Sequence, residues 1–227
     1  MGEGVMPSLS ELTPAEGARL LAKPEGELGI AIGESMNKNN APVIEAVYRR
    51  LRMQTGQCVL EIGFGNGRTV PLLMQQADRL TYIGIDIAET MVVEATAFNR
   101  ELIDLGRVNF YLASSEAIPS ADASIDRACA INVVYFWPDP VRVLAEIRRV
   151  LRPGVFSVVA GIDVATAAEA PFSRVEFGFR AREADELIDL HRAAGFEAIE
   201  IEPFDYVSKR SDGTPWPRHY DLAIATR

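Results

Sequence analysis

Two acids and three glycines between residues 61 and 86 have the types and spacing to bind a ligand. Glu61 ends a short apolar run, and Gly63, Gly65 and Gly67 follow it at every second position. Glycine tolerates positive φ and lets a ligand approach the backbone, while free N–H groups at the start of a following helix attract an anion. Asp86 ends the next apolar run, where a carboxylate can accept both hydroxyls of a ribose. The stretch therefore predicts a nucleoside-type ligand site between two strands.

The glycine spacing separates two kinds of nucleoside ligand. A dinucleotide site requires G-x-G-x-x-G, and Arg68 stands at the position of its third glycine, which disfavours a nicotinamide-dependent oxidoreductase. The pattern here is E-x-G-x-G-x-G, which resembles motif I of the class I S-adenosylmethionine (SAM) methyltransferases. The structural alternative is that the glycines only turn a strand into a helix. The resemblance extends from about residue 17 to the end and implies SAM as cofactor, with S-adenosylhomocysteine as product.

The resemblance also implies which residues hold the cofactor. They belong to motif I, to the end of the second strand, and to the loops after the third and fourth strands: Glu61, Gly63, Phe64, Gly65, Asn66, Gly67, Asp86, Ile87, Met91, Ser114, Ser115, Glu116 and Asn132. The family often has Asp where this chain has Ser114, so the adenine contact differs there. No metal site is expected.

No motif identifies a catalytic residue. Methyl transfer from a sulfonium needs alignment and exclusion of water, and a general base only where the acceptor must lose a proton. The candidates are Tyr135 and Trp137 after the fourth strand, whose aromatic faces could attract a cation or cap the core, and His219 as a possible base. The sequence after Asn132 lacks the N/D-P-P-Y/F pattern of amino- and DNA-methylating relatives, which disfavours N-methylation.

Composition limits the partners and the location. The 227 residues carry a net charge of −9, which argues against nucleic acid as substrate. The two cysteines, Cys58 and Cys129, stand in apolar runs and predict core residues in a reducing, cytoplasmic setting. The first residues lack the pattern of a signal peptide, and no apolar run is long enough to span a membrane. We expect a monomer or homodimer that acts on a small molecule.

Strands and helices alternate from residue 58 to residue 201, which predicts an α/β fold with helices on both faces of a parallel sheet. The resemblance implies a three-layer, Rossmann-like methyltransferase fold with seven strands in the order 3-2-1-4-5-7-6, strand 7 being antiparallel. The expected strands are 58–61, 80–86, 108–112, 126–131, 155–161, 196–201 and 220–226. The helices expected beside them are 68–76, 88–100, 140–151 and 183–194.

The region before the first strand divides at residue 40. Residues 1–40 are predicted to form a cover segment, with a short helix that begins at Thr13 and an open, glycine-rich segment before Asn40. Residues 41–227 would form the SAM-binding domain, beginning with a helix over 41–53. We expect residues 17–40 to close over the ligand, and the long link 163–182, with its phenylalanines and arginines, to cover an apolar or anionic substrate.

Two functions from different classes follow. The first is an enzyme, a SAM-dependent methyltransferase acting on a small-molecule acceptor. The second is a non-catalytic SAM-binding sensor or partner protein, which would bind the same cofactor without consuming it.

Overall fold

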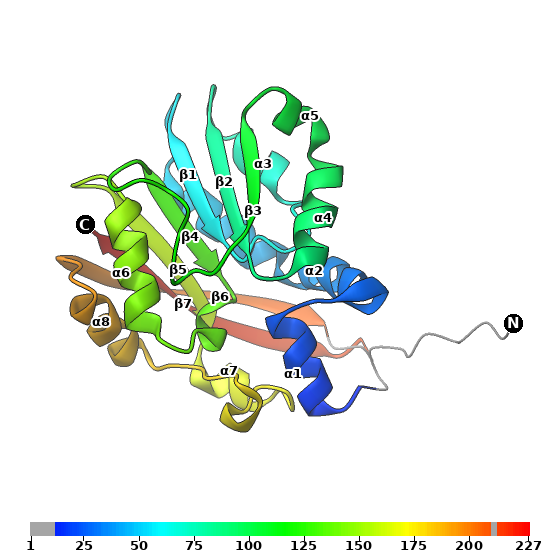
Figure 1. Cartoon of the computed structure of the whole chain (residues 1–227). Helices are drawn as coiled ribbons and strands as arrows, with labels where there is room; N and C mark the ends of the chain where they lie inside the picture. Colours follow the sequence, from blue (N-terminus) through cyan, green and yellow to red (C-terminus); the bar gives the residue numbers. More distant parts are fainter. Residues whose placement is uncertain (1–11, 210–212) are drawn as a thin grey trace, which may run out of the picture.

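A computed structural model of the chain describes residues 12–209 and 213–227 (Figure 1). These residues build a seven-stranded sheet in the order β3-β2-β1-β4-β5-β7-β6, in which the first five strands are parallel to one another and β7 is antiparallel to both its partners. The strands are β1 Cys58–Ile62, β2 Thr81–Asp86, β3 Val108–Leu112, β4 Arg127–Ile131, β5 Phe156–Ile162, β6 Ala198–Lys209 and β7 Pro215–Thr226. The predicted fold class and strand order are confirmed.

Helices cover both faces of the sheet. α2 packs on α4 and on the strands at one face, and α6 packs on α8 at the other, as the two layers of Figure 1 show. The helices are α1 Pro14–Ala22, α2 Gly26–Leu51, α3 Val70–Met74, α4 Glu89–Phe98, α5 Arg100–Asp104, α6 Pro140–Val150, α7 Val164–Ala168 and α8 Ala184–Ala193, with 3₁₀ turns η2 Val134–Phe136 and η3 Val175–Phe177. Parallel strands place their carboxyl ends at one edge, where such sheets bind ligands.

The predicted open segment before residue 41 is wrong. Residues 26–51 form one continuous helix, α2, so the expected boundary at residue 40 falls inside a helix. Two of its glycines serve close packing rather than flexibility. A Cβ on Gly29 would lie 2.6 Å from the Pro24 backbone, and one on Gly33 would lie 3.3 Å from Met91 Sδ. Pro42 remains inside the helix. α1 does begin at the predicted capping box of Thr13 and Glu16.

The last two strands are much longer than predicted. β6 and β7 each have 12 residues and form a hairpin whose far end extends beyond the parallel strands. Side chains alternate between the two faces along the whole hairpin. This alternation continues beyond the apolar residues from which the shorter strands were predicted. Arg50 of α2 holds β6 through Glu202, with Nε 2.7 Å from Oε2. Farther along β6, the Tyr206 hydroxyl donates to the Asn39 carbonyl of α2 at 2.9 Å, so the extended end of the hairpin forms a wall at the ligand edge of the sheet.

The core lies between the sheet and its helices, and Cys129 is buried in it while Cys58 is half-buried beside it. Within the described ranges, no helix has the length and apolar character needed to cross a membrane. The expectation about a signal peptide concerns residues 1–14, of which 1–11 lie outside the described residues.

Candidate active site

The three glycines of the turn after β1 all have positive φ, but only one of them faces open space. The φ angles are 72° at Gly63, 60° at Gly65 and 68° at Gly67. A Cβ on Gly63 would lie 2.3 Å from Val133 Cγ1, and one on Gly67 would lie 2.6 Å from Ala95 Cβ. At Gly65 nothing lies within 4 Å of such a Cβ. The outer glycines therefore shape the turn, and Gly65 provides the bare backbone that a ligand can approach.

Asp86 closes the other side of this turn. Its Oδ1 accepts a hydrogen bond from the Ala88 N–H at 2.8 Å, which fixes the carboxylate at the end of β2. Burial raises the pKa of Asp86 to about 6 against the lowering effect of nearby backbone N–H groups, including that of Gly65. Ile87, beside it, is 49% exposed and offers an apolar surface at the same edge. These groups fit a nucleoside, with its ribose on the carboxylate and its flat base against the isoleucine.

Glu61 is placed beneath the turn rather than at its surface. The carboxylate is buried and accepts hydrogen bonds from the Tyr48 hydroxyl at 2.9 Å and the Tyr82 hydroxyl at 2.9 Å. Burial raises the pKa of Glu61 to about 7, the two tyrosines partly opposing this effect. Its side chain therefore supports the turn from below, and this role was not foreseen from the sequence.

Three other expected cofactor residues also have buried side chains. Phe64 packs on Phe110, with ring centroids 4.7 Å apart. Met91 is fully buried and reaches toward Gly33 of α2. Asn66 accepts a hydrogen bond from Asn37 Nδ2, while its own Nδ2 has no partner among the described residues. Their side chains hold the turn in place and connect it to α2.

The loop after β3 carries the three residues expected near an adenine. Ser114 is exposed and its Oγ accepts from the Glu116 N–H at 3.2 Å. Glu116 forms an ion pair with Arg142 at 3.3 Å, which draws its carboxylate toward α6. Ser115 is half-buried between them. The loop adjoins Asp86, because the Ala113 N–H donates to the Asp86 carbonyl at 3.0 Å.

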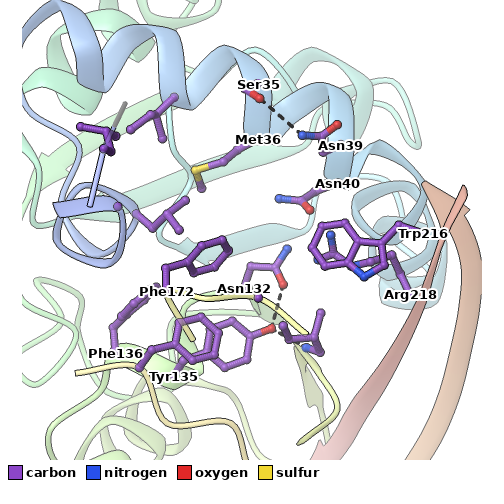
Figure 2. Close-up of a pocket in the computed structure, with 17 residues that line it drawn as sticks. Ser35, Met36, Asn39, Asn40, Asn132, Tyr135, Phe136, Phe172, Trp216 and Arg218 are labelled. Atoms are coloured by element: carbon purple, nitrogen blue, oxygen red, sulfur yellow. Dashed lines mark hydrogen bonds between the residues drawn. The ribbon is translucent and has the colours of Figure 1, made fainter. Parts of the chain in front are cut away.

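A cavity of about 290 Å³ lies beside the glycine turn, between α1, α2, the end of β4, the 163–182 link and the β6–β7 hairpin. Figure 2 shows α2 residues above it, Tyr135, Phe136 and Phe172 below it, and Trp216 with Arg218 at one side. Its lining is mostly apolar and aromatic: Leu12, Gly17, Leu21, Ile32, Ser35, Met36, Asn39, Asn40, Asn132, Tyr135, Phe136, Ile162, Ala170, Phe172, Phe179, Trp216 and Arg218. Such a lining suits a small, flat organic molecule.

Asn132 joins the cavity to the end of β4. It has a φ of 60°, which is uncommon for a residue other than glycine and frequent at functional sites. Its Oδ1 accepts from the Tyr135 hydroxyl at 2.9 Å, and that hydroxyl also accepts from the Ile162 N–H. Burial raises the pKa of Tyr135 well above its usual value, and its ring stacks on Phe179 with centroids 4.3 Å apart. Tyr135 is therefore a neutral wall residue that fixes the Asn132 amide.

The other two catalytic candidates lie outside the cavity. Trp137 is buried and borders a separate groove between α6 and α8. His219 is exposed, and its Nδ1 lies 2.9 Å from Asp205 Oδ1, which raises its pKa. Strand alternation turns His219 to the face opposite Arg218. Arg218 was missed, although Trp216, Arg218 and Tyr220 stand at every second position of β7 and share one face.

Two pairs of adjacent residues show how close the cavity is to the glycine turn. Asn132 lines the cavity, and the next residue, Val133, fills the space at Gly63. Ile32 of α2 lines the cavity, and the next residue, Gly33, faces Asn66 and Met91. A molecule in the cavity and one at the turn would therefore be neighbours.

Comparison with known proteins agrees with this geometry. Residues 60–159 match the family described as "Methyltransferase domain". The chain is 28% identical over 173 residues to the O-methyltransferase resE of Aspergillus sclerotiorum, covering 74% of this chain and 65% of that one. It is 30% identical over 160 residues to the O-methyltransferase rstn1 of Aspergillus nomiae, covering 68% and 71%. Against three further curated relatives it spans 40%, 59% and 56% of their length.

The fold also matches solved structures. The complex of a putative methyltransferase with the Trm112 methyltransferase activator of Haloferax volcanii aligns with a TM-score of 0.71 at 17% identity, covering 86% of this chain and 93% of that one. With the strand order 3-2-1-4-5-7-6, the E-x-G-x-G-x-G turn and the Asp86 carboxylate, the chain belongs to the class I SAM-dependent methyltransferases.

Proposed function

We propose that the protein transfers the methyl group of SAM to an oxygen atom of a small organic acceptor bound in the cavity. The bare backbone at Gly65 and the Asp86 carboxylate would hold SAM, which supplies a methyl group already activated by its sulfonium. Relatives named O-methyltransferases support oxygen as the acceptor atom. The absence of an N/D-P-P-Y/F pattern after Asn132 agrees with this choice.

The observation that carries the proposal is the contiguity of the two sites. Residues 132–133 and 32–33 each have one member in the cavity wall and the next against the glycine turn. Alignment of two bound reactants supplies most of the rate enhancement that a methyl transfer needs, because the reacting carbon is already electrophilic. A sensor that only binds SAM would not need an apolar cavity beside the cofactor.

The cavity wall contains no His, Asp, Glu, Lys or Cys among the described residues. The Tyr135 hydroxyl in the cavity wall is neutral and donates to Asn132, so it cannot accept a proton. The acceptor oxygen must therefore form its bond to the methyl carbon with a lone pair that it brings, while the carbon–sulfur bond breaks and sulfur keeps the electron pair. A proton carried by a neutral hydroxyl would have to pass to water.

The test is acceptor-dependent turnover. The purified protein is incubated with methyl-labelled SAM and a panel of phenols, aromatic acids and alcohols, and S-adenosylhomocysteine is measured. We expect product with at least one acceptor and none with Gly65→Val, a variant whose new side chain occupies the bare backbone position. Tight S-adenosylhomocysteine binding without turnover of any acceptor would favour the non-catalytic alternative.

A further inference from the structure

We propose that the acceptor enters the cavity as an anion and that Arg218 is the residue that selects its charge. The substrate class is a flat, apolar molecule with one negatively charged group, such as an aromatic carboxylate. This inference rests on the proposed function for the identity of the cavity as the acceptor site, and it goes further by fixing the charge of the molecule that binds there.

Arg218 is a buried cation that has no counter-ion among residues 12–209 and 213–227. Its side chain lies in the cavity wall, and the residue is only 9% exposed. Nη2 donates to the Tyr220 hydroxyl at 3.1 Å, whereas Nε has no hydrogen-bond partner within the described residues. No carboxylate of those residues forms an ion pair with it. A buried charge normally requires a partner, because removing it from water is costly.

Aromatic rings position the guanidinium but do not neutralise it. Its central carbon lies 4.3 Å from the centroid of the Trp216 ring and 5.7 Å from that of Tyr220. Such contacts stabilise a cation much less than the full solvation that burial removes. The rings therefore hold the planar group at the side of the cavity seen in Figure 2, with its charge available to a bound molecule.

A second buried arginine shows how this protein treats a structural cation. Arg182 is 6% exposed, and its Nη1 donates to the Val134 carbonyl at 2.8 Å and the Arg180 carbonyl at 3.0 Å. Its Nε also lies 3.5 Å from Glu186. The Arg182 Nε, like that of Arg218, makes no hydrogen bond, but Arg182 has carbonyl acceptors and a nearby carboxylate, and among the described residues Arg218 has neither. Arg218 borders the cavity, whereas Arg182 borders the separate groove between α6 and α8.

Two acids of the hairpin, Asp205 and Asp221, lie on the face opposite Arg218, and Glu202, which shares the face of Arg218, is paired with Arg50. Arg218 lies opposite Tyr206 in the β6–β7 register, on the face with Trp216 and Tyr220. Asp205 lies opposite His219 on the other face and bonds to it. Asp221 is on that other face too, where Asp163, Glu183 and Asp205 add to burial in raising its pKa. A negatively charged acceptor would therefore meet a cation and no competing carboxylate in the described cavity wall.

The experiment compares matched probes by calorimetry with saturating S-adenosylhomocysteine, using 1-naphthoate, its neutral amide 1-naphthamide, 1-naphthyl phosphate and inorganic phosphate. We expect 1-naphthoate to bind the wild-type protein roughly 10- to 100-fold more tightly than 1-naphthamide, as a hydrogen-bonded charge pair implies. Arg218→Met should abolish the difference, and Arg218→Lys should restore part of it. The relative affinities of the carboxylate and the phosphate ester decide which anionic group the cavity prefers.

Arg127→Met is the matched control. Arg127 stacks on Phe156 at 4.4 Å, much as Arg218 stacks on Trp216, but it lies at the amino end of β4, away from the cavity. The Arg127→Met variant should keep the preference for 1-naphthoate over 1-naphthamide. Any one of four results would overturn the proposal. Two concern the wild-type protein and the naphthyl probes: equal affinity for 1-naphthoate and 1-naphthamide, or no binding of 1-naphthoate and 1-naphthyl phosphate. The other two are inorganic phosphate binding as tightly as these two anions, and a preference for the acid that survives in Arg218→Met. None of these results touches methyl transfer itself, which acceptor-dependent turnover tests separately.

Discussion

The cofactor half and the acceptor half of the ligand edge are built in different ways. The glycine turn and Asp86 lie within 26 residues of one another along the chain, counting from 61 to 86, and belong to one strand–helix–strand unit. The cavity wall draws on α1, α2, the end of β4, the 163–182 link and β7. The first half is local in sequence, and the second exists only after the chain has folded. Variants should therefore act differently in the two halves.

The largest effect should come from the centre of the cofactor half. Gly65→Val places a branched side chain in the space that SAM would occupy, and we expect S-adenosylhomocysteine affinity to fall by roughly 100-fold or more. The fold should tolerate it, since nothing lies within 4 Å, although positive φ adds a strain of about 1–3 kcal/mol. Calorimetry measures the affinity, and thermal unfolding measures the strain.

Gly56→Val is the control for that strain. Gly56 also has positive φ and open space around it, but it precedes β1 at the opposite end of the strand. The Gly56→Val variant should lose a similar amount of stability and keep its affinity for S-adenosylhomocysteine. Unchanged affinity in Gly65→Val would remove the basis for placing the cofactor at this turn.

The second prediction concerns Asp86 and has a pH signature. Asp86→Asn should weaken S-adenosylhomocysteine binding by about 1–3 kcal/mol, or roughly 5- to 150-fold, because it cannot accept from both ribose hydroxyls. The wild-type carboxyl has its pKa raised to about 6, so affinity should decline as pH falls through 6 and the carboxylate gains a proton. The variant should show a flatter profile. Equal wild-type affinity for the ligand and its 2′-deoxy analogue would contradict this role.

How much of each half could be predicted from sequence follows from the same contrast. Gly65 and Asp86 were identified because their neighbours along the chain fix their geometry. Arg218 was missed and His219 preferred, because only the register of the hairpin decides which of two adjacent side chains enters the cavity. The continuous α2 was missed because Gly29 and Gly33 look like breaks until the Pro24 and Met91 contacts are known.

A third prediction tests the layer beneath the glycine turn. Glu61 has its pKa raised to about 7 from 4.5, so the folded state binds the proton more tightly than the unfolded state. Its contribution to stability is therefore greatest below pH 4.5 and is lost as pH rises through 7, a change of roughly 3 kcal/mol at most. Glu61→Gln should remove this change. Chemical denaturation at pH 5 and pH 8 measures it, with the exposed Glu45→Gln as control; the same pH change in both variants would exclude the assignment.

A fourth prediction separates positioning from proton transfer in the acceptor half. Tyr135→Phe leaves the buried Ile162 N–H without its acceptor and should lower the free energy of unfolding by about 1–3 kcal/mol. Because the Tyr135 pKa is well above its usual value, the pH profile of methyl transfer should keep its shape. Rates from pH 6 to pH 9 decide this, with the exposed Tyr111→Phe as control. Loss of the alkaline or the acidic limb of the pH–rate profile in Tyr135→Phe would show that the hydroxyl transfers protons.

The smallest effect should appear where the two halves meet, in the first half of α2. We proposed from sequence that this segment closes over the ligand, and its contacts suggest the route. Asn37 donates to Asn66 of the glycine turn, and the Gly26 N–H donates to Thr90 Oγ1 at 3.1 Å. A ligand that orders the turn would also favour these contacts. We expect residues 26–40 to exchange their amide hydrogens several-fold more slowly with S-adenosylhomocysteine, and residues 41–51 to change little.

Variants show whether Asn37 carries this coupling. Asn37→Ala removes the bond to Asn66 and should abolish most of the added protection while binding weakens only slightly, since the turn itself is intact. Asn39→Ala is the matched control, because Asn39 is exposed and its side-chain amide bonds, among the described residues, only to Ser35 at 3.4 Å. Glycine-containing helical segments lose more backbone entropy on ordering, so a small gain in contacts is enough to shift their opening equilibrium. Equal exchange with and without ligand would mean that α2 is a fixed wall, and that the acceptor half is preformed before the cofactor binds.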